Sequence, residues 1–345
     1  MDPILYVSTI DAEPLHRYRE GGYHPVALGH ILKEGSYKIL HKLGWGGYST
    51  VWAARDQRLD ETYVAIKFSV SESENDRGNR EVRVMKKLAS IHPSPQHVMC
   101  ILDDFELEGP NGTHKCLVFE LLGPSVTDVT DAHFPDGRLP GKLAKSVAKQ
   151  AFIGLDTLHQ QKIGHGDLHT RNLAFTMPCL DDLPEGEYPG VPEYIVRHAV
   201  YRLHPWSSLS NIKIVDFGES LLQSAVPQTL HTPLPVRAPE IIFKDHLDYR
   251  VDLWSMGCML FELFVGQPPF DSFLITPTIL VGQIREMASD TLPARWMDSP
   301  DILDGTFTAD VSGEDLTKEG VVKLGQIIGR LMDLSLLLGE FSEIA

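Results

Sequence analysis

Cysteine is scarce in this chain, and long apolar runs are absent. The four cysteines, Cys100, Cys116, Cys179 and Cys258, include no Cys-x-x-Cys pair, so the sequence indicates neither a zinc site nor a disulfide framework. No run of about 18 apolar residues occurs, which argues against a transmembrane helix. Residues Met1 to Ile10 lack the basic segment of a secretory leader. We therefore expect a soluble protein of the cytoplasm, the nucleus or both, without a membrane partner.

Basic residues are also few. The 345 residues include 31 Lys and Arg against 47 Asp and Glu, which gives a formal net charge of -16. A chain this acidic repels the phosphates of nucleic acids, so direct nucleic-acid binding is not expected. The charge favours a basic protein partner, although it also fits a role in solubility alone. With 43% hydrophobic and 23% charged residues, the composition is that of a globular protein.

The periodicity of apolar residues divides the chain into a strand-rich part and a helix-rich part. In the first part, the alternation predicts strands within Tyr37 to Val70, one of them at Tyr63 to Phe68, and apolar spacing predicts a helix at Asn79 to Leu88. A second strand pair is predicted at Met99 to Phe105 and Lys115 to Glu120, around a turn at Gly109 to Gly112. In the second part the pattern predicts helices Gly141 to His159 and Val251 to Val265 and a short strand Asn211 to Val215. Strands followed by helices indicate an α+β protein with two lobes, and a cleft between lobes is the usual ligand site.

A glycine-rich turn and a lysine follow each other in the first part. Gly44 to Val51 lies between two predicted strands, where glycines let a hairpin bring backbone N–H groups close to phosphate oxygens. Lys67 lies on the next strand and Glu81 on the following helix, so the carboxylate can aim the ammonium at the phosphates of a nucleotide. Taken singly, each residue also fits a solvated surface position, and the order of the three is what favours nucleotide binding.

The segment His165 to Asn172 and the later Asp216-Phe217-Gly218 carry the strongest signal. Asp167 is placed to accept the proton of a substrate hydroxyl, while Asn172 and Asp216 are placed to hold magnesium ions. Arg237-Ala238-Pro239-Glu240 and Asp252-Leu253-Trp254 follow in the order of the protein kinase pattern. We therefore predict a bilobal protein kinase fold of the α+β class that uses ATP and Mg²⁺.

Several further motifs stand out: Gly21 to Val26, Lys42 to Gly46, Ser49 to Trp52, Leu102-Asp103-Asp104-Phe105, Asn111 to His114 and Val118 to Glu120. In these motifs the chain resembles the SR-protein kinases, which phosphorylate serines in Arg/Ser-rich segments. The resemblance is strong from about Tyr18 to Gly123 and weaker to about Leu338. It implies a serine/threonine kinase that acts on basic Arg/Ser-rich protein substrates, and we expect a monomer.

The resemblance also implies domains and a nucleotide site. Residues 1–36 form an N-terminal extension, 37–122 the small lobe and 123–345 the large lobe, with an insert at 178–210. Phe119 is then the gatekeeper, and Glu120 to Leu122 form the hinge that binds adenine. The implied nucleotide-binding residues are Leu43, Gly44, Gly46, Ser49, Val51, Ala65, Lys67, Phe119, Glu120 and Leu122.

Some residues depart from the kinase pattern. Gly166 stands where an arginine usually precedes the catalytic aspartate, so no arginine there can receive an activation-loop phosphate. His169 stands in place of the lysine expected beside the γ-phosphate, and Arg171 is the candidate to replace that charge. The catalytic residues are therefore predicted to be Asp167, Lys67, Glu81, Asn172, His169 and Arg171.

The end of the chain departs as well. No arginine follows Arg330, so Glu240 is expected to lack its usual buried partner and the C-terminus to be truncated after helix Val321 to Leu334. Arginine-binding carboxylates are expected among Asp271, Asp298, Asp301 and Asp304, while Val236 stands where the resembled family has tyrosine.

Two alternatives to an active protein kinase stay open. His169 and the short C-terminus fit a pseudokinase or scaffold that binds ATP without efficient transfer, although the presence of Lys67, Asp167 and Asp216 argues against it. The pattern His-Gly-Asp-x-His-x-x-Asn also resembles the catalytic loop of small-molecule phosphotransferases. Those enzymes generally lack the Ala-Pro-Glu segment that ends at Glu240, which makes this the weakest of the three.

Overall fold

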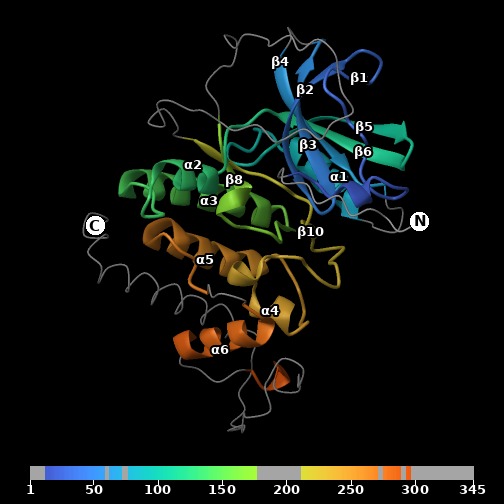
Figure 1. Ribbon diagram of the computed structural model, residues 1–345. Coiled ribbons are helices and arrows are strands. Elements are labelled where there is room, and N and C mark those ends of the chain that lie inside the picture. Colours follow the sequence, from blue (N-terminus) through green and yellow to red (C-terminus); the bar gives the residue numbers. More distant parts are fainter. Residues whose placement is uncertain are drawn as a thin grey trace. The chain divides into compact units, whose positions relative to one another are not determined.

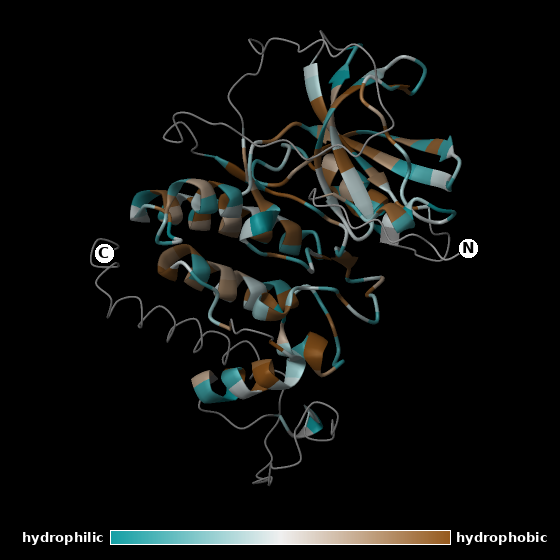
Figure 2. Ribbon diagram, viewed as in Figure 1, coloured by the Kyte–Doolittle hydropathy of each residue, from teal (hydrophilic) through white to brown (hydrophobic). Residues whose placement is uncertain are grey.

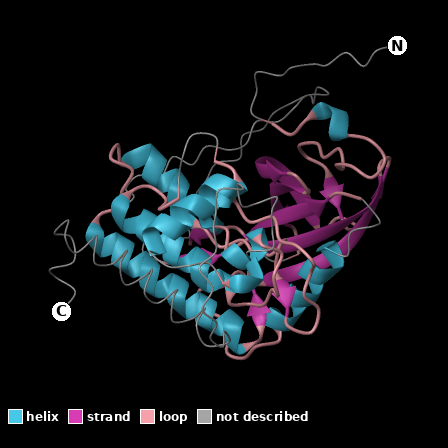
Figure 3. Cartoon of the chain, turned by 90° about the horizontal axis from the view of Figure 1, so that it is seen from below, coloured by secondary structure: helices cyan, strands magenta, loops and turns pink. Residues whose placement is uncertain are grey.

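The computed structural model describes residues 12–58, 62–71, 77–176, 211–270, 275–288 and 293–296. They divide into two compact units. The first runs to Gly123 and takes in Phe175, and the second comprises Pro124 to Ala174 together with the chain from residue 211 onward. Figure 3 shows that the strands gather in the first unit and most helices in the second. The predicted insert at 178–210 and helix Val321 to Leu334 lie outside the described residues, and the predicted domain boundaries stay predictions.

The first unit is built on one antiparallel sheet of six strands in the order β1-β2-β3-β4-β6-β5 (Figure 1). The strands are β1 (Ile31–Leu32), β2 (Tyr37–Gly46), β3 (Ser49–Asp56), β4 (Thr62–Ser69), β5 (Ile101–Gly109) and β6 (Gly112–Glu120). The predicted turn closes the β5–β6 hairpin, where Gly109 pairs with Gly112. Helix α1 (Arg77–Ala89) crosses from β4 to β5, as the apolar spacing predicts, and the short helix η1 (Leu15–Arg17) precedes the sheet.

One face of this sheet carries the core of the first unit. Alternation along the strands places large apolar side chains together on that face, since side chains two residues apart point the same way. Trp52 is 2% exposed and Phe68 is 1% exposed, and burying a side chain such as that of Phe68 contributes about 1.5 to 3 kcal/mol. The buried cluster comprises Leu32, Tyr37, Ile39, Trp52, Ala54, Val64, Ile66, Phe68, Cys116 and Val118.

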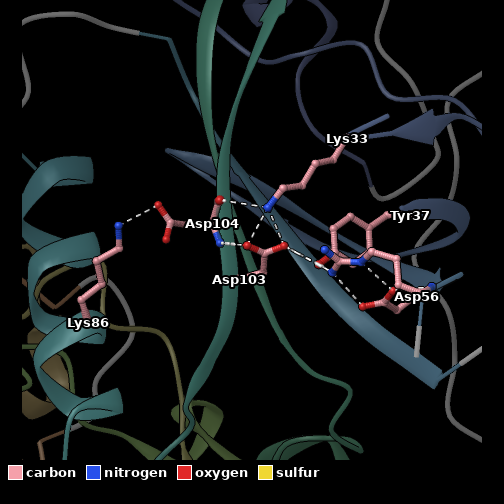
Figure 4. Close-up of polar contacts among 7 residues, drawn as sticks. Lys33, Tyr37, Asp56, Lys86, Asp103 and Asp104 are labelled. Carbon is pink, nitrogen blue, oxygen red and sulfur yellow. Dashed lines mark hydrogen bonds and ion pairs between the residues drawn. The ribbon is translucent and has the colours of Figure 1, made fainter. Parts of the chain in front are cut away.

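Two adjacent acidic residues of β5, Asp103 and Asp104, form polar contacts on opposite sides of the strand (Figure 4). Asp103 accepts hydrogen bonds from the Lys33 ammonium at 2.6 Å and from the Tyr37 hydroxyl at 2.6 Å. Asp104 points the other way and pairs with Lys86 of helix α1 at 2.9 Å. Strand β5 therefore links the β1–β2 connection to the helix that bears Glu81.

The second unit is mainly helical. Its longer helices are α2 (Val126–His133), α3 (Gly141–Gln160), α5 (Val251–Val265) and α6 (Pro277–Ala288), with the single turn α4 (Pro239–Ile242). Short strands pair β7 (Ile163–Gly164) with β10 (Leu221–Leu222), and β8 (Leu173–Phe175) with β9 (Ile212–Ile214). The remaining turns are η2 (Thr170–Asn172), η4 (Leu234–Val236) and η5 (Ala294–Trp296).

Helix α5 is the central element of the second unit. It is mostly hydrophobic in Figure 2 and buries ten of its residues, which is the pattern of a helix packed on all sides. It ends at Gly266, whose φ of 90° is the left-handed conformation that terminates many helices. No described helix in the chain is both long enough and apolar enough to cross a membrane.

Candidate active site

The first unit contributes a buried ion pair. Lys67 of β4 and Glu81 of α1 place Nζ and Oε1 2.7 Å apart, with only 11% and 4% of the side chains exposed. In so buried a pair, desolvation offsets most of the attraction, so its contribution to net stability is small. Its main effect is to fix where the ammonium group lies, as the order of the two motifs predicts.

The glycine-rich turn is the tip of the β2–β3 hairpin. Gly44 pairs with Val51, Gly46 pairs with Ser49, and Val51 also pairs with Lys67 on β4. A Cβ atom added at Gly44 or Gly46 would meet no heavy atom within 4 Å. The hairpin thus leaves room on its glycine side for a ligand to approach the backbone, which fits nucleotide phosphates.

The predicted hinge residues also belong to the first unit. Phe119 of β6 pairs with Ala65 of β4, and Glu120 pairs with Val64. Phe119, Ala65 and Leu122 are buried, whereas Leu43 and Glu120 are partly exposed. The adjacent strands therefore bring Gly44, Val51, Lys67, Ala65 and Phe119 onto neighbouring positions of one sheet.

The second unit contributes the loop that carries Asp167. One carboxylate organises this loop: Asp252 of α5, which is fully buried, accepts the backbone N–H groups of His165 and Gly166, both at 2.7 Å. The same carboxylate lies 3.0 Å from Nε2 of His159. The His165 ring donates from Nε2 to the Val215 carbonyl oxygen at 2.9 Å. These bonds hold both the Asp167 segment and the end of β9.

Asp167 has one carboxylate oxygen prepared for a further proton. Its Oδ2 is 3.3 Å from the Asn172 amide nitrogen, whereas its buried Oδ1 has no hydrogen-bond partner among the residues that the structure describes. Nε2 of His169 lies 3.5 Å from that Oδ1 and 3.3 Å from the Asn172 amide nitrogen. The carboxylate is therefore suited to accept a hydroxyl proton, and His169 is brought to it.

Asn172 and Asp216 are the predicted metal ligands. The Asn172 amide nitrogen donates to the Asp167 carbonyl oxygen at 2.8 Å, so the side-chain oxygen of Asn172 is the atom suited to a cation. Asp216 follows β9 with a φ of 60° and accepts the Gly218 N–H at 3.2 Å. The Val215 N–H donates to the Asn172 carbonyl oxygen at 2.9 Å and joins the two segments. Carboxylate and amide oxygens fit Mg²⁺, the ion expected here.

Arg171 has a different environment. Its side chain is exposed, and its charge acts on Glu262 of α5, as does that of His169. Burial raises the pKa of Glu262, while a hydrogen bond from the Thr170 hydroxyl at 2.8 Å works against that rise. The replacement of the missing lysine by Arg171 stays a prediction.

The structure gives a physical reason for Gly166. Its φ is 77°, a left-handed value that disfavours other residues, and an added Cβ would lie 2.6 Å from the Glu219 carbonyl oxygen. The Gly166 carbonyl oxygen accepts the Thr232 hydroxyl at 2.6 Å. A neutral hydroxyl thus joins the catalytic loop to the segment before Ala-Pro-Glu.

Sequence reasoning missed Thr232, Glu262 and the anchoring role of Asp252. The one sequence feature that pointed to such supports was Gly166 in place of arginine, because without that arginine another group has to hold the loop that carries Asp167. The predicted arginine-binding carboxylates Asp271, Asp298, Asp301 and Asp304 lie outside the described residues. Val236, by contrast, is described and buried, and its carbonyl oxygen accepts the Ser255 hydroxyl at 2.8 Å.

Within the described part of the chain, the carboxyl of Glu240 has no close cation. Burial is the main reason that the pKa of its carboxyl is raised, with Asp245 adding to the rise. Arg295 acts in the opposite direction on Glu240, but its own ion pair, at 2.5 Å, is with Asp245. Among residues 12–296 that the structure describes, Arg295 is the cation that acts on the buried Glu240 side chain, and it does not offset the effect of burial.

Comparisons with known proteins agree with this geometry. The protein kinase domain family matches residues 37–291. "Serine/threonine-protein kinase SRPK" of Physarum polycephalum is 31% identical in an alignment 277 residues long, which covers 72% of this chain and 65% of that protein. "Protein kinase dsk1" of Schizosaccharomyces pombe is 37% identical over 169 residues (48% and 30%), and human "SRSF protein kinase 3" is 36% identical over 170 residues (48% and 29%).

The matches confirm two of the predictions made from sequence. The α+β kinase fold class is correct, and so is the resemblance to SR-protein kinases. The chain spans slightly less than two thirds of the length of the first of these relatives.

Proposed function

The chain belongs to the protein kinase family, and from that premise we propose that it is a serine/threonine kinase that phosphorylates serines in Arg/Ser-rich protein segments. The observation that carries the proposal is the Asp167 carboxylate, in a loop fixed by Asp252, where one buried oxygen has no hydrogen-bond partner from the described parts of the chain. A carboxylate in this environment is suited to accept the proton of an attacking hydroxyl.

Each unit supplies a different part of the proposed reaction. Lys67, held by Glu81, binds and orients the phosphates of ATP, and the hairpin glycines let the backbone approach them. Asn172 and Asp216 would hold Mg²⁺, which would neutralise charge on the phosphates when bound. Asp167 orients the serine hydroxyl and takes its proton, with His169 beside the same carboxylate.

The substrate class rests on charge and on the relatives. A net charge of -16 favours a basic partner. Two of the similar proteins are named "Serine/threonine-protein kinase SRPK" and "SRSF protein kinase 3". These names state the substrate class of those two proteins only. For this chain we propose arginine-rich serine substrates, action as a monomer, and a place in the cytoplasm or nucleus.

Radiolabelled phosphate transfer tests the proposal. The purified chain is given an Arg/Ser peptide, the matched Lys/Ser peptide and an acidic peptide, with Lys67→Met as the inactive control. We expect transfer to the Arg/Ser peptide to be the fastest and to weaken as salt screens the contacts. Equal turnover of all three peptides would refute the substrate class. Nucleotide binding without transfer to any peptide would instead identify a pseudokinase.

A further inference from the structure

The segment before the sheet folds back onto the first unit. The Tyr23 N–H donates to the Arg17 carbonyl oxygen at 3.0 Å, which closes a loop around Gly21 and Gly22. The Gly21 N–H donates to the Asn111 carbonyl oxygen at 2.9 Å, and the Asn111 amide donates to the Tyr23 carbonyl oxygen at 2.6 Å. Residues Glu13 to Tyr23, called here the N-terminal latch, are therefore fixed to the β5–β6 turn.

Close approach within the latch explains one glycine of the Gly21 to Val26 motif. A Cβ atom added at Gly22 would lie 1.8 Å from the Arg17 carbonyl oxygen. No real side chain tolerates that distance, so the loop that presents Arg17 and Tyr23 requires glycine at position 22.

Two side chains of the latch reach the tip of the glycine-rich hairpin. The Tyr23 hydroxyl, on a side chain that is 1% exposed, donates to the Gly46 carbonyl oxygen at 2.7 Å. The Arg17 guanidinium donates to the Gly47 carbonyl oxygen and lies 4.9 Å from the centre of the Tyr23 ring. Consecutive carbonyl groups at the tip are thus held by two donors from outside the hairpin.

The latch also holds the hairpin nearer its base. Lys42 of β2 forms a buried ion pair with Glu13, which in turn accepts the Tyr18 hydroxyl. Lys42 is followed by a register shift between Lys42 and Gly44, so the pair fixes the strand directly before the glycines. The hairpin is therefore fastened at both the tip and the base by one short segment.

Fixing these carbonyl groups fixes the donors on the other side of the same peptide planes. In a planar trans peptide the C=O of one residue and the N–H of the next point in opposite directions. Holding the carbonyls of Gly46 and Gly47 therefore sets the directions of the N–H groups of Gly47 and Tyr48. Preorganised N–H groups bind anionic oxygens better than mobile ones, because no reorganisation is needed on binding.

We propose that Arg17 and Tyr23 are positioning residues for nucleotide binding, which orient the backbone N–H groups of the glycine-rich hairpin toward the phosphates. The inference rests on the proposed function, since it assumes that the chain binds ATP. It assigns to the Gly21 to Val26 motif a role in the reaction rather than in packing alone. The residues touch the hairpin and not the nucleotide, so they act through Gly46 and Gly47.

The test compares ligands with and without phosphates. Tyr23→Phe keeps the ring and removes the donor to Gly46, and Arg17→Ala removes the donor to Gly47. We expect Tyr23→Phe to weaken MgATP binding about fivefold, which is the usual net effect of one lost hydrogen bond, and the double variant to weaken it further. Adenosine has no phosphates, so its affinity, measured by calorimetry in the same way, stays unchanged.

The matched control is Tyr63→Phe. The Tyr23 hydroxyl accepts a hydrogen bond from Arg17 at 3.4 Å. Tyr63 likewise accepts one from Arg55 at 2.7 Å and lies under its guanidinium, but it is on β4, away from the hairpin tip. Both affinities should stay at the wild-type value in this variant.

The outcomes separate the two proposals. Weaker MgATP binding with unchanged adenosine binding, in the Tyr23 and Arg17 variants and not in Tyr63→Phe, supports the positioning role. If these variants leave the ratio of MgATP affinity to adenosine affinity unchanged, whether or not both affinities fall, the positioning role is overturned and the proposed function stays intact. A wild-type chain that binds adenosine and MgATP equally well also overturns it, and one that binds no ATP overturns both proposals.

Discussion

The two units hold their candidate active-site groups in different ways. In the first unit a charged side chain is held by another charged side chain, as Lys67 is by Glu81. In the second unit a whole loop is held through its backbone, because Asp252 accepts the N–H groups of His165 and Gly166. An ion pair places one charge and depends on where helix α1 lies, whereas backbone bonds fix the path of the loop itself. The lysine proposed to bind phosphates and the loop that carries the proposed base thus have separate supports.

The largest expected effect separates binding from chemistry. Asp167→Ala removes the proposed base and should lower kcat about 10³-fold, within the usual range for a general base. MgATP affinity should stay near the wild-type value, because the predicted metal ligands Asn172 and Asp216 are intact. Asp216→Ala should instead weaken MgATP binding. Thermal-shift titration with MgATP and steady-state kinetics measure the two effects, and equal loss of ATP binding in both variants would show that the roles are misassigned.

The second prediction breaks the backbone support. Asp252→Ala leaves the buried N–H groups of His165 and Gly166 without their acceptor, at about 1 to 3 kcal/mol for each group. Urea unfolding should therefore show a lower free energy of unfolding. Asp136→Ala is the control, since the Asp136–Arg138 pair of the same unit is exposed and should change stability by less than about 1 kcal/mol. Equal effects of the two variants would contradict the anchoring role.

The third prediction concerns the conformation of the loop rather than its anchor. Gly166→Ala should lower the free energy of unfolding by at least about 1 to 2 kcal/mol, the cost of a left-handed conformation for an L-residue. The contact with the Glu219 carbonyl oxygen adds to that cost. Gly141→Ala, at a helix start with open space around the new Cβ, serves as the control. Chemical denaturation measures both variants, and a stable Gly166→Ala would argue against the strain.

The smallest expected effect tests whether the buried carboxyl of Glu240 lowers the stability of the second unit. Burial raises the pKa of Glu240, so the folded state holds this proton more tightly than the unfolded chain does. The resulting stabilisation is present below the unfolded pKa and is lost as pH rises through the folded pKa. Glu240→Gln should therefore raise the melting temperature at pH 7, by about 2 to 4 °C for each kcal/mol gained, and change it little at pH 4.

Glu106→Gln controls for the general loss of a carboxylate, because Glu106 is exposed on β5 beside Lys115. It should leave the melting temperature unchanged at both pH values. A Glu240→Gln shift of the same size at pH 4 and pH 7 would mean that packing, and not charge, is responsible.

The sequence predicted the parts of the site that have local patterns. Alternation placed Lys67 on a strand, apolar spacing placed Glu81 on a helix, and the Gly109 to Gly112 turn lies where its composition indicated. The order of these motifs then predicted the ion pair. Local periodicity is sufficient here because each element is long and regular.

The supports between distant segments could not be predicted in this way. Asp252 bonds to residues 86 and 87 positions earlier, Thr232 to Gly166 across 66 positions, and Lys42 to Glu13 across 29. Each partner alone is an ordinary polar residue in its own segment. Their pairing depends on how the chain folds back, and a single sequence carries no local signal for that.

The two acidic residues of β5 make this strand intolerant of length changes. Neighbouring residues of a strand point to opposite faces of the sheet. Asp103 therefore contacts Lys33 and Tyr37 on one face, and Asp104 contacts Lys86 on the other. Deleting one residue before Asp103 would turn each carboxylate away from its cations and toward the other side. Among related sequences, substitutions in β5 should therefore be found far more often than insertions or deletions.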